Sequence, residues 1–92
     1  MPTMTIPNDE EMLEVVKHAM RESRAVTFIP VEQVAITHKL SEIGVDSIAA
    51  VEVAALLEDR FAIRLPDDQL ARVSSVRDLL TIVQRELRLA AA

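Results

Sequence analysis

Residues that interrupt helices are few in this chain and widely spaced. The 92 residues contain one glycine, Gly44, and four prolines, at positions 2, 7, 30 and 66. Between these positions, aliphatic residues recur at intervals of three and four, which is the period of a helix with one buried face. The pattern therefore predicts an all-α fold whose helices are separated near the prolines and Gly44.

Three longer segments and one short segment carry this helical pattern. They span about 8–24, 47–61, 67–71 and 75–89. The first has Asn8 as a capping residue, with Glu11 placed to complete a capping box. With no convincing strand between them, the segments predict a small four-helix bundle that forms a single domain over residues 1–92. We expect residues 1–7 and 90–92 to be loose ends.

The segment between the first two predicted helices, 25–46, has no regular period. Phe28, Ile29 and Val31 flank Pro30, and further aliphatic residues follow at irregular intervals. We expect a long loop that its own aliphatic side chains hold against the bundle, with a short helical turn at 31–34.

Composition and charge exclude several functions. Fifteen acidic residues against ten basic residues give a net charge of −5, and aromatic residues make up only 2% of the chain. Such a chain repels a phosphate backbone and has few rings on which bases could stack, so nucleic acid is not an expected partner. The absence of cysteine removes thiol chemistry, and His18 and His38 lack a matching set of zinc ligands, so no metal site is predicted.

Targeting and membrane signals are also missing from the sequence. The first residues have neither a basic start nor an apolar segment, and no apolar run approaches about 20 residues. We expect a soluble, cytoplasmic monomer that does not bind a membrane.

The residues of greatest chemical interest lie at the start of the second predicted helix. Ser47 is in its first turn, Asp46 precedes it, and Gly44 provides the turn before them. Free backbone N–H groups and the positive end of the helix dipole favour a phosphate there, which makes the Ser47 hydroxyl a candidate phosphoester site. A simpler interpretation is that Asp46 and Ser47 only cap the helix. These residues alone leave both interpretations open.

Ser47 lacks the sequence context of a catalytic serine. A nucleophilic serine needs a base, and the chain has no Gly-x-Ser-x-Gly motif and only two histidines, of which His38 lies in the predicted loop. We therefore predict no catalytic residue and no enzyme activity.

A longer series of residues around Ser47 resembles the acyl carrier protein family. It reads Leu40-x-x-Ile43-Gly44-Val45-Asp46-Ser47-Ile48, close to the family's L-x-x-L-G-x-D-S-L. The similarity continues through Val51-Glu52-Val53, Leu57-Glu58-Asp59-Arg60-Phe61, Ile63-x-Leu65-Pro66-Asp67-Asp68 and Val73-x-Ser75-Val76-x-Asp78-Leu79. The resemblance covers nearly all of the chain.

The resemblance implies a carrier whose Ser47 receives 4′-phosphopantetheine from coenzyme A through a separate phosphopantetheinyl transferase. The prosthetic group would supply the thiol that the chain lacks and would hold acyl groups as thioesters. Asp46 would either cap the helix only, or cap it and also help the transferase hold Mg²⁺ and coenzyme A.

The resemblance also implies two sets of contact residues. Those that would contact partner enzymes are Ile48, Val51, Glu52, Ala55, Glu58 and Asp59. Those that would line an acyl pocket between the second and third helices are Val53, Leu57, Phe61, Leu65 and Leu70. Residues 46–71 contain six acidic and two basic residues, a local charge of −4, which suits brief docking on basic patches. The alternative is that Val51 packs against the short helix and the acidic residues are only solvated.

Several departures from the family pattern bear on the pathway. They are Ala49, Ala50, Arg60, Ala62 and Arg64. These residues look more like those of a carrier in polyketide or hybrid polyketide–nonribosomal assembly, loaded by an acyltransferase or an acyl-activating ligase and serving a ketosynthase. The cargo would be acyl or aminoacyl. The alternatives are a carrier of primary fatty-acid synthesis and an unmodified helical interaction module.

Overall fold

The computed structural model describes residues 6–91, which form four α-helices and two short 3₁₀ helices. These are α1 (Asp9–Ser23), η1 (Val31–Gln33), η2 (Leu40–Ile43), α2 (Ser47–Phe61), α3 (Asp67–Leu70) and α4 (Val76–Ala91). Extended pairing within the described residues is limited to one isolated bridge between Lys39 and Ser75. The predicted all-α architecture, with three longer helices, one short helix and a long first loop, is confirmed.

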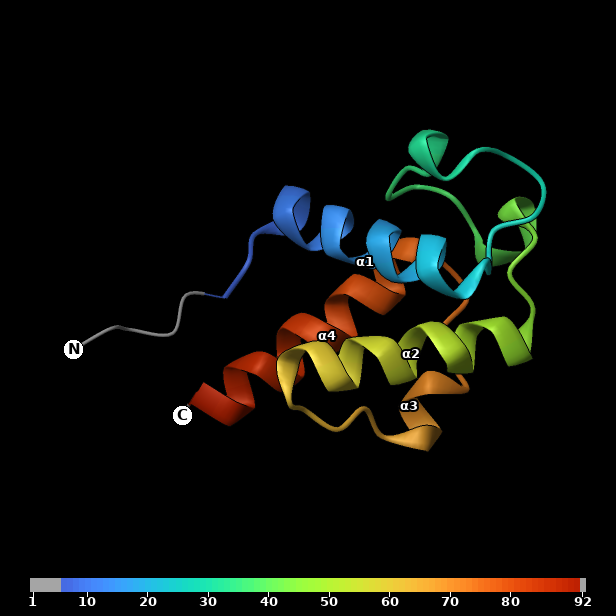
Figure 1. The fold of residues 1–92 in the computed structure, drawn as a ribbon. Coiled ribbons are helices and arrows are strands. Elements are labelled where there is room, and N and C mark those ends of the chain that lie inside the picture. The colour runs from blue at the N-terminus through green and yellow to red at the C-terminus, as the bar shows by residue number, and fades with distance from the viewer. Residues whose placement is uncertain (1–5, 92) are drawn as a thin grey trace.

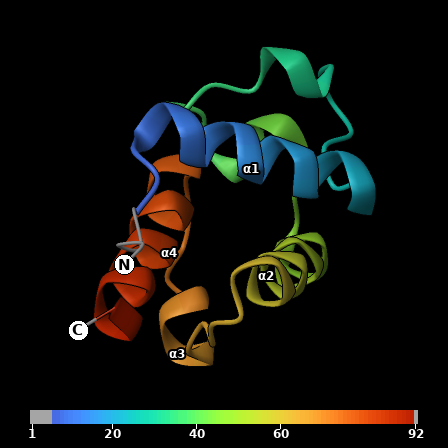
Figure 2. The same ribbon diagram turned by 60° about the vertical axis from the view of Figure 1, so that its left-hand side comes forward.

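The three longer helices surround one aliphatic core. α1 crosses over α2 and α4, and α3 lies on the far side of that pair from α1 (Figures 1 and 2). The largest fully buried side chains are Met12, Val16, Met20, Ile43, Val53, Leu57, Val76, Leu80 and Val83. Because these residues come from α1, η2, α2 and α4, the core depends on all of the longer elements together.

Side-chain caps fix where the helices begin. The Glu11 N–H donates to Asn8 Oδ1 at 2.8 Å, and the Asn8 N–H donates to Glu11 Oε1 at 3.1 Å, which completes the predicted capping box of α1. At α4, the Asp78 N–H donates to Ser75 Oγ at 3.0 Å and the Ser75 N–H donates to Asp78 Oδ2 at 3.2 Å. Both caps are as the sequence predicted.

The long loop between α1 and α2 is held against the start of α4. The N–H groups of Val76 and Arg77 donate to the carbonyl oxygens of His38 and Ile36, at 3.0 and 3.1 Å. The Leu40 N–H donates to the Ser74 carbonyl at 3.0 Å. The first N–H groups of a helix have no partner within the helix, so the loop satisfies two that α4 would otherwise leave free.

The structure corrects three details of the predicted fold. Residues 40–43 form a 3₁₀ helix, which the irregular spacing of the loop did not indicate, while the turn predicted at 31–34 is present as η1. α4 continues to Ala91, because alanine favours the helix, so residues 90–91 are not a loose tail. Ile6 packs against the core and Gln84 Nε2 donates to the Pro7 carbonyl at 3.4 Å, so these two residues are not loose either. Residues 1–5 and 92, also predicted to be loose, lie outside the described part.

Candidate functional site

Gly44 ends η2 and lets the chain turn into α2. Its φ is +83°, in the left-handed region that glycine adopts without strain. A Cβ at this position would overlap Thr27 Oγ1 and would lie 3.1 Å from ring atoms of Phe28. The glycine therefore allows the first loop to pack directly on the turn that precedes Ser47.

Asp46 is the N-cap residue of α2. Its Oδ1 accepts a hydrogen bond from the Ala49 N–H at 2.8 Å, and its carbonyl oxygen accepts one from the Ala50 N–H at 2.9 Å. The predicted capping role of Asp46 is confirmed. Its role toward a modifying enzyme stays a prediction.

Ser47 is the first residue of α2 and is exposed. Within residues 6–91, no group forms a hydrogen bond with its hydroxyl, and the N–H groups of Ser47 and Ile48 also have no partner. The first turn of α2 thus presents a free hydroxyl beside two unpaired donors and the positive end of a 15-residue helix. This arrangement fits a phosphate ester on Ser47.

A groove of about 710 Å³ opens beside Ser47, and we call it the Ser47 groove. Its apolar wall includes Ala50, Val53 and Ala54 of α2, Leu40 and Val45 from the first loop, and Leu70 of α3. Ser41 and Ser47 also line it. A groove with mainly aliphatic walls beside an exposed hydroxyl can receive a flexible chain attached to that hydroxyl.

Only part of the predicted acyl pocket coincides with the Ser47 groove. Val53 and Leu70 line it, whereas Leu57, Phe61 and Leu65 do not. Leu57 and Phe61 lie one and two helical turns beyond Val53. Leu57 is buried in the core and Phe61 is half-buried. Leu65 instead borders a separate depression of about 430 Å³ beside the last turn of α2.

The residues predicted to contact partners divide into two sets: Ile48, Glu52 and Asp59 lie outside the Ser47 groove, and Val51, Ala55 and Glu58 line it. Ile48 and Val51 are 72% and 60% exposed, and Glu52, Ala55 and Asp59 are exposed as well. Val51 lines the groove together with Leu70 of α3, but its 60% exposure shows that most of its side chain is not covered by that helix. Contact with a partner stays a prediction for all of these residues.

Glu58 differs from the rest of this set because it has a partner within the chain. It is half-buried, and its Oε2 accepts a hydrogen bond from the Leu65 N–H at 2.8 Å. The carboxylate thus fastens the segment between α2 and α3 to the last turns of α2. No pattern in the sequence predicts this contact, because the two residues are seven positions apart and lie on either side of a helix end.

The remaining ionisable groups show no catalytic arrangement around Ser47. His18 Nε2 lies 2.9 Å from Glu22 Oε1, and His38 Nδ1 accepts a hydrogen bond from the Ala35 N–H at 2.9 Å. Neither histidine hydrogen bonds to Ser47. In residues 6–91, no cluster of three or more His, Cys, Asp or Glu residues could hold a metal ion. Over the same residues, no helix has the length and hydropathy needed to cross a membrane.

Two of the three carboxyl groups with lowered pKa values, those of Asp9 and Asp78, serve contacts within and between α1 and α4. Hydrogen bonds from the Gln84 amide and the Arg77 guanidinium lower the pKa of Asp9, at 2.9 and 2.8 Å. The Ser74 backbone N–H, with help from the Ser74 and Ser75 side chains, lowers the pKa of Asp78. These groups tie α1 to α4 and cap α4, and neither lines the Ser47 groove.

Comparison with known proteins supports the phosphate-ester interpretation of this site. Residues 24–83 match the family described as "Phosphopantetheine attachment site". The chain belongs to this family, that of the acyl carrier proteins. It is 30% identical to the anthracycline acyl carrier protein DpsG of Streptomyces peucetius over 82 residues, which are 89% of this chain and 98% of that protein. It is 42% identical to the actinorhodin polyketide synthase acyl carrier protein of Streptomyces coelicolor over 53 residues, which are 58% and 62% of the two chains.

Solved structures agree with the family assignment. The hexanoyl form of the actinorhodin carrier from Streptomyces coelicolor superposes with a TM-score of 0.72 at 27% identity, covering 94% of this chain and 96% of that one. The acyl carrier protein of Thermotoga maritima superposes with a TM-score of 0.74 at 26% identity, covering 88% and 91%. Members of this family carry covalently attached 4′-phosphopantetheine and are carriers instead of catalysts, as the sequence predicted.

Proposed function

We propose that this protein is an acyl carrier of polyketide assembly and that 4′-phosphopantetheine is attached to Ser47. The observation that carries the proposal is the exposed Ser47 hydroxyl, placed in the first turn of α2 and at the edge of a largely aliphatic groove. Two similar carriers, named for actinorhodin and anthracycline, favour polyketide assembly as the pathway.

The residues around Ser47 suit the attachment of this prosthetic group and the holding of its cargo. Asp46 accepts the hydrogen bond from the Ala49 N–H, so the cap of α2 does not use the Ser47 hydroxyl, which stays free. The unpaired N–H groups of Ser47 and Ile48 favour the negative charge of a phosphodiester. When bound, the prosthetic group supplies a thiol that holds the cargo as a thioester. The Ser47 groove offers that cargo a partly sheltered surface.

The proposed partners are a phosphopantetheinyl transferase, an acyltransferase or acyl-activating ligase that loads the cargo, and a ketosynthase. The exposed side chains of Ile48 and Val51, with Glu52 and Asp59 nearby, provide an apolar stripe with an acidic rim for them. We also propose that the cargo can be aminoacyl and that the pathway can be a hybrid of polyketide and nonribosomal assembly. A second candidate is a carrier of fatty-acid synthesis, because the chain is also 33% identical over 46 residues to the acyl carrier protein of Thermobifida fusca, whose name specifies no polyketide.

The attachment site is tested by intact mass. Purified apo protein is incubated with coenzyme A, Mg²⁺ and a broad-specificity phosphopantetheinyl transferase. We expect the wild type to gain one phosphopantetheinyl group and Ser47→Ala to gain none. Ser41→Ala is the matched control, because Ser41 is also exposed and lines the same groove. It should be modified like the wild type.

Two results would contradict the proposal. Modification of Ser47→Ala would place the group elsewhere. A wild type that stays unmodified by two different transferases, while circular dichroism shows an intact helical fold, would favour an unmodified interaction module. The modified protein is then incubated with a purified malonyl-specific acyltransferase or with an acyl-activating ligase. The enzyme that loads it identifies which of the two proposed loading routes applies.

A further inference from the structure

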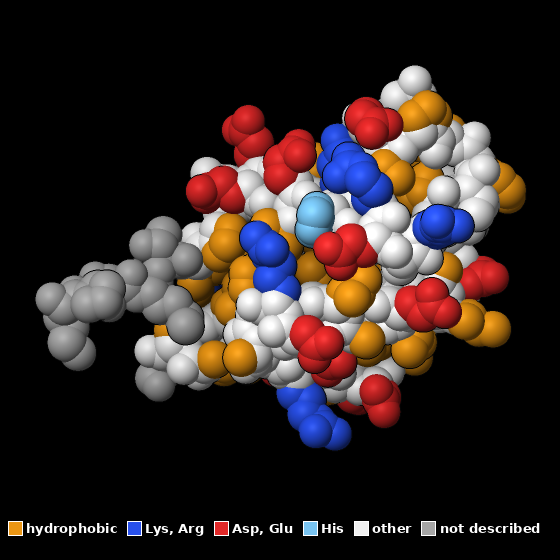
Figure 3. Space-filling view, in the orientation of Figure 1, with side chains coloured by type: hydrophobic (Ala, Val, Ile, Leu, Met, Phe, Trp, Pro, Cys, Tyr) orange, Lys and Arg blue, Asp and Glu red, His pale blue; other side chains and the backbone are white. Residues whose placement is uncertain are grey.

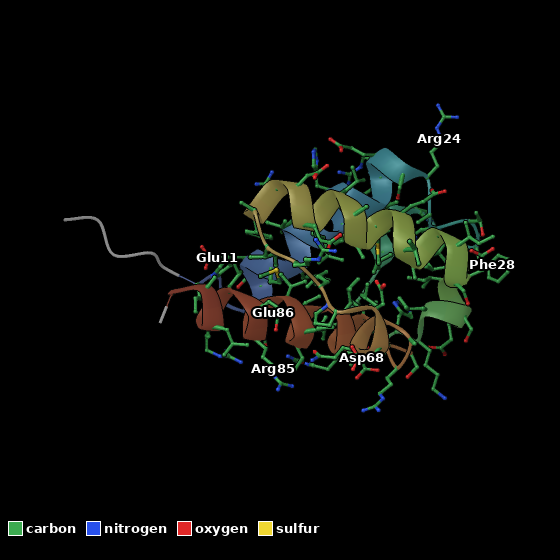
Figure 4. All side chains as sticks on the ribbon, turned by 90° about the horizontal axis from the view of Figure 1, so that it is seen from below. Glu11, Arg24, Phe28, Asp68, Arg85 and Glu86 are labelled. Carbon is green, nitrogen blue, oxygen red and sulfur yellow. The ribbon has the colours of Figure 1, made fainter. Side chains whose placement is uncertain are left out.

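Large exposed hydrophobic side chains gather at the end of the molecule where α2 begins. Four such side chains occur in residues 6–91: Phe28 at 71% exposure, Ile48 at 72%, Val51 at 60% and Leu89 at 61%. Ile48 and Val51 follow Ser47 on α2, and Phe28 lies beside the start of that helix (Figure 4). Leu89 is near the other end of the chain, in the last turn of α4. The space-filling view shows hydrophobic and acidic side chains interleaved along the right-hand edge, where α2 begins (Figure 3).

Phe28 is held in place although most of its ring is exposed. Its N–H and that of Thr27 both donate to the Ile43 carbonyl, at 3.3 and 3.1 Å, and Thr27 Oγ1 donates to the Gly44 carbonyl at 3.2 Å. The ring lies so close to Gly44 that a Cβ there would come within 3.1 Å of it. The backbone of Phe28 is therefore fixed, and its ring rests beside Gly44, on the turn that leads to Ser47, with most of its surface exposed.

An exposed aromatic ring on a fixed backbone is well suited to bind another protein. Binding would remove its apolar surface from water at little cost in conformational entropy, and aromatic residues are enriched among the residues that dominate binding energy. The neighbouring exposed acids, Glu42, Asp46 and Glu52, favour a partner whose apolar depression has a basic rim.

The position of the ring indicates which partner this is. Enzymes that act on the cargo reach it at the end of a flexible arm, so they can bind Ile48 and Val51 on α2 without covering the turn that precedes Ser47. The enzyme that forms the phosphoester must bring its donor into contact with Ser47 Oγ itself, and it therefore covers the surface around that hydroxyl. Phe28, on the turn before Ser47, lies within this surface.

We propose that Phe28 is a docking contact for the phosphopantetheinyl transferase that modifies Ser47. The docking surface then has two parts, one on the first half of α2 with Ile48 and Val51, and one on the first loop with Phe28. This inference rests on the proposed function, because it requires Ser47 to be the residue that is modified.

The test is the rate of phosphopantetheinyl transfer to variants of the full chain. Transfer from coenzyme A by a purified transferase is followed by intact mass as the apo-protein concentration is varied. We expect Phe28→Ser to lower kcat/KM at least tenfold, mainly through a higher KM, and Phe28→Leu to restore much of it. Leu89→Ser, which removes an equally exposed apolar side chain far from Ser47, should transfer like the wild type. Thermal melts by circular dichroism check that each variant is folded.

Several results would overturn this inference. A kcat/KM for Phe28→Ser within twofold of wild type would do so, as would an equal loss in Leu89→Ser. If Phe28→Ser slowed only acyl transfer from the loaded protein, the contact would belong to a later enzyme. If sedimentation showed a wild-type dimer that Phe28→Ser dissociates, the contact would be a second copy of the chain. Failure of the proposed function is distinguishable from all of these, because the wild type itself would then stay unmodified.

Discussion

Replacing Gly44 with alanine should destabilise the protein strongly, because two separate costs meet at that position. The backbone there has a φ of +83°, which an L-residue adopts at a cost of about 1–2 kcal/mol. The new Cβ would also overlap Thr27 Oγ1 and crowd the Phe28 ring, and overpacking of this kind costs about 1–3 kcal/mol.

The two costs are partly offset in the unfolded state. Alanine has less backbone freedom than glycine there, which returns about 0.4–1 kcal/mol. The net loss for Gly44→Ala is then about 1–4.5 kcal/mol, and the middle values of the three ranges give about 3 kcal/mol. For a chain of 92 residues, 1 kcal/mol corresponds to about 4–8 °C in Tm, so a loss of about 3 kcal/mol should lower the melting temperature by about 12–24 °C.

Urea and thermal unfolding, followed by circular dichroism, measure this loss. A Thr27→Ala background removes the oxygen that the new methyl group overlaps, so the cost of Gly44→Ala should be at least about 1 kcal/mol smaller there, leaving mainly the backbone term. A loss below about 1 kcal/mol in the wild-type background would refute the reasoning. So would an equal loss in both backgrounds, because the overlap would then contribute nothing.

Substitutions at three further residues test the backbone conformation of Ala62 and the hydrogen bonds of Glu58 and Asp78. Ala62 also has a left-handed backbone, with a φ of 53°, so Ala62→Gly should stabilise the protein by about 0.5–1 kcal/mol; a lower urea midpoint would contradict this. Glu58→Ala should destabilise by about 1 kcal/mol through loss of the hydrogen bond to the Leu65 N–H, and Glu58→Gln, which keeps an acceptor, should lose less. Hydrogen bonds lower the pKa of Asp78 in the folded protein, so its carboxylate stabilises the fold at any pH above the unfolded pKa of about 3.9. This contribution to the free energy of unfolding is lost as pH falls through the folded pKa. The stability difference between wild type and Asp78→Asn should therefore shrink between pH 5 and about pH 2, and a constant difference would disagree with this assignment.

The sequence predicted the regular elements well because their determinants are local. The capping boxes at Asn8 and Ser75 and the aliphatic periods of the helices depend on residues a few positions apart. Ser47 and Asp46 could be singled out for the same reason, since a helix start and its cap lie within one turn.

The parts that were missed depend on contacts between distant segments. Residues 40–43 become helical because Leu40 and Ile43 are buried and the Leu40 N–H bonds to the Ser74 carbonyl, a partner that no local pattern indicates. The groove wall combines the first loop, α2 and α3, so its residues could not be identified from the period of α2 alone. This is why the period of α2 assigns Leu57 and Phe61 to the pocket, although Leu57 is buried in the core and neither residue lines the groove.

The first loop and the start of α4 share two backbone hydrogen bonds, from Val76 to His38 and from Arg77 to Ile36. The two segments should therefore open together when the native protein fluctuates. The amide protons of Val76 and Arg77 can exchange with solvent only when these bonds break. Their protection factors therefore measure how often the loop detaches. A partner that binds the loop in its folded position would slow exchange at these two amides of α4 without touching either residue.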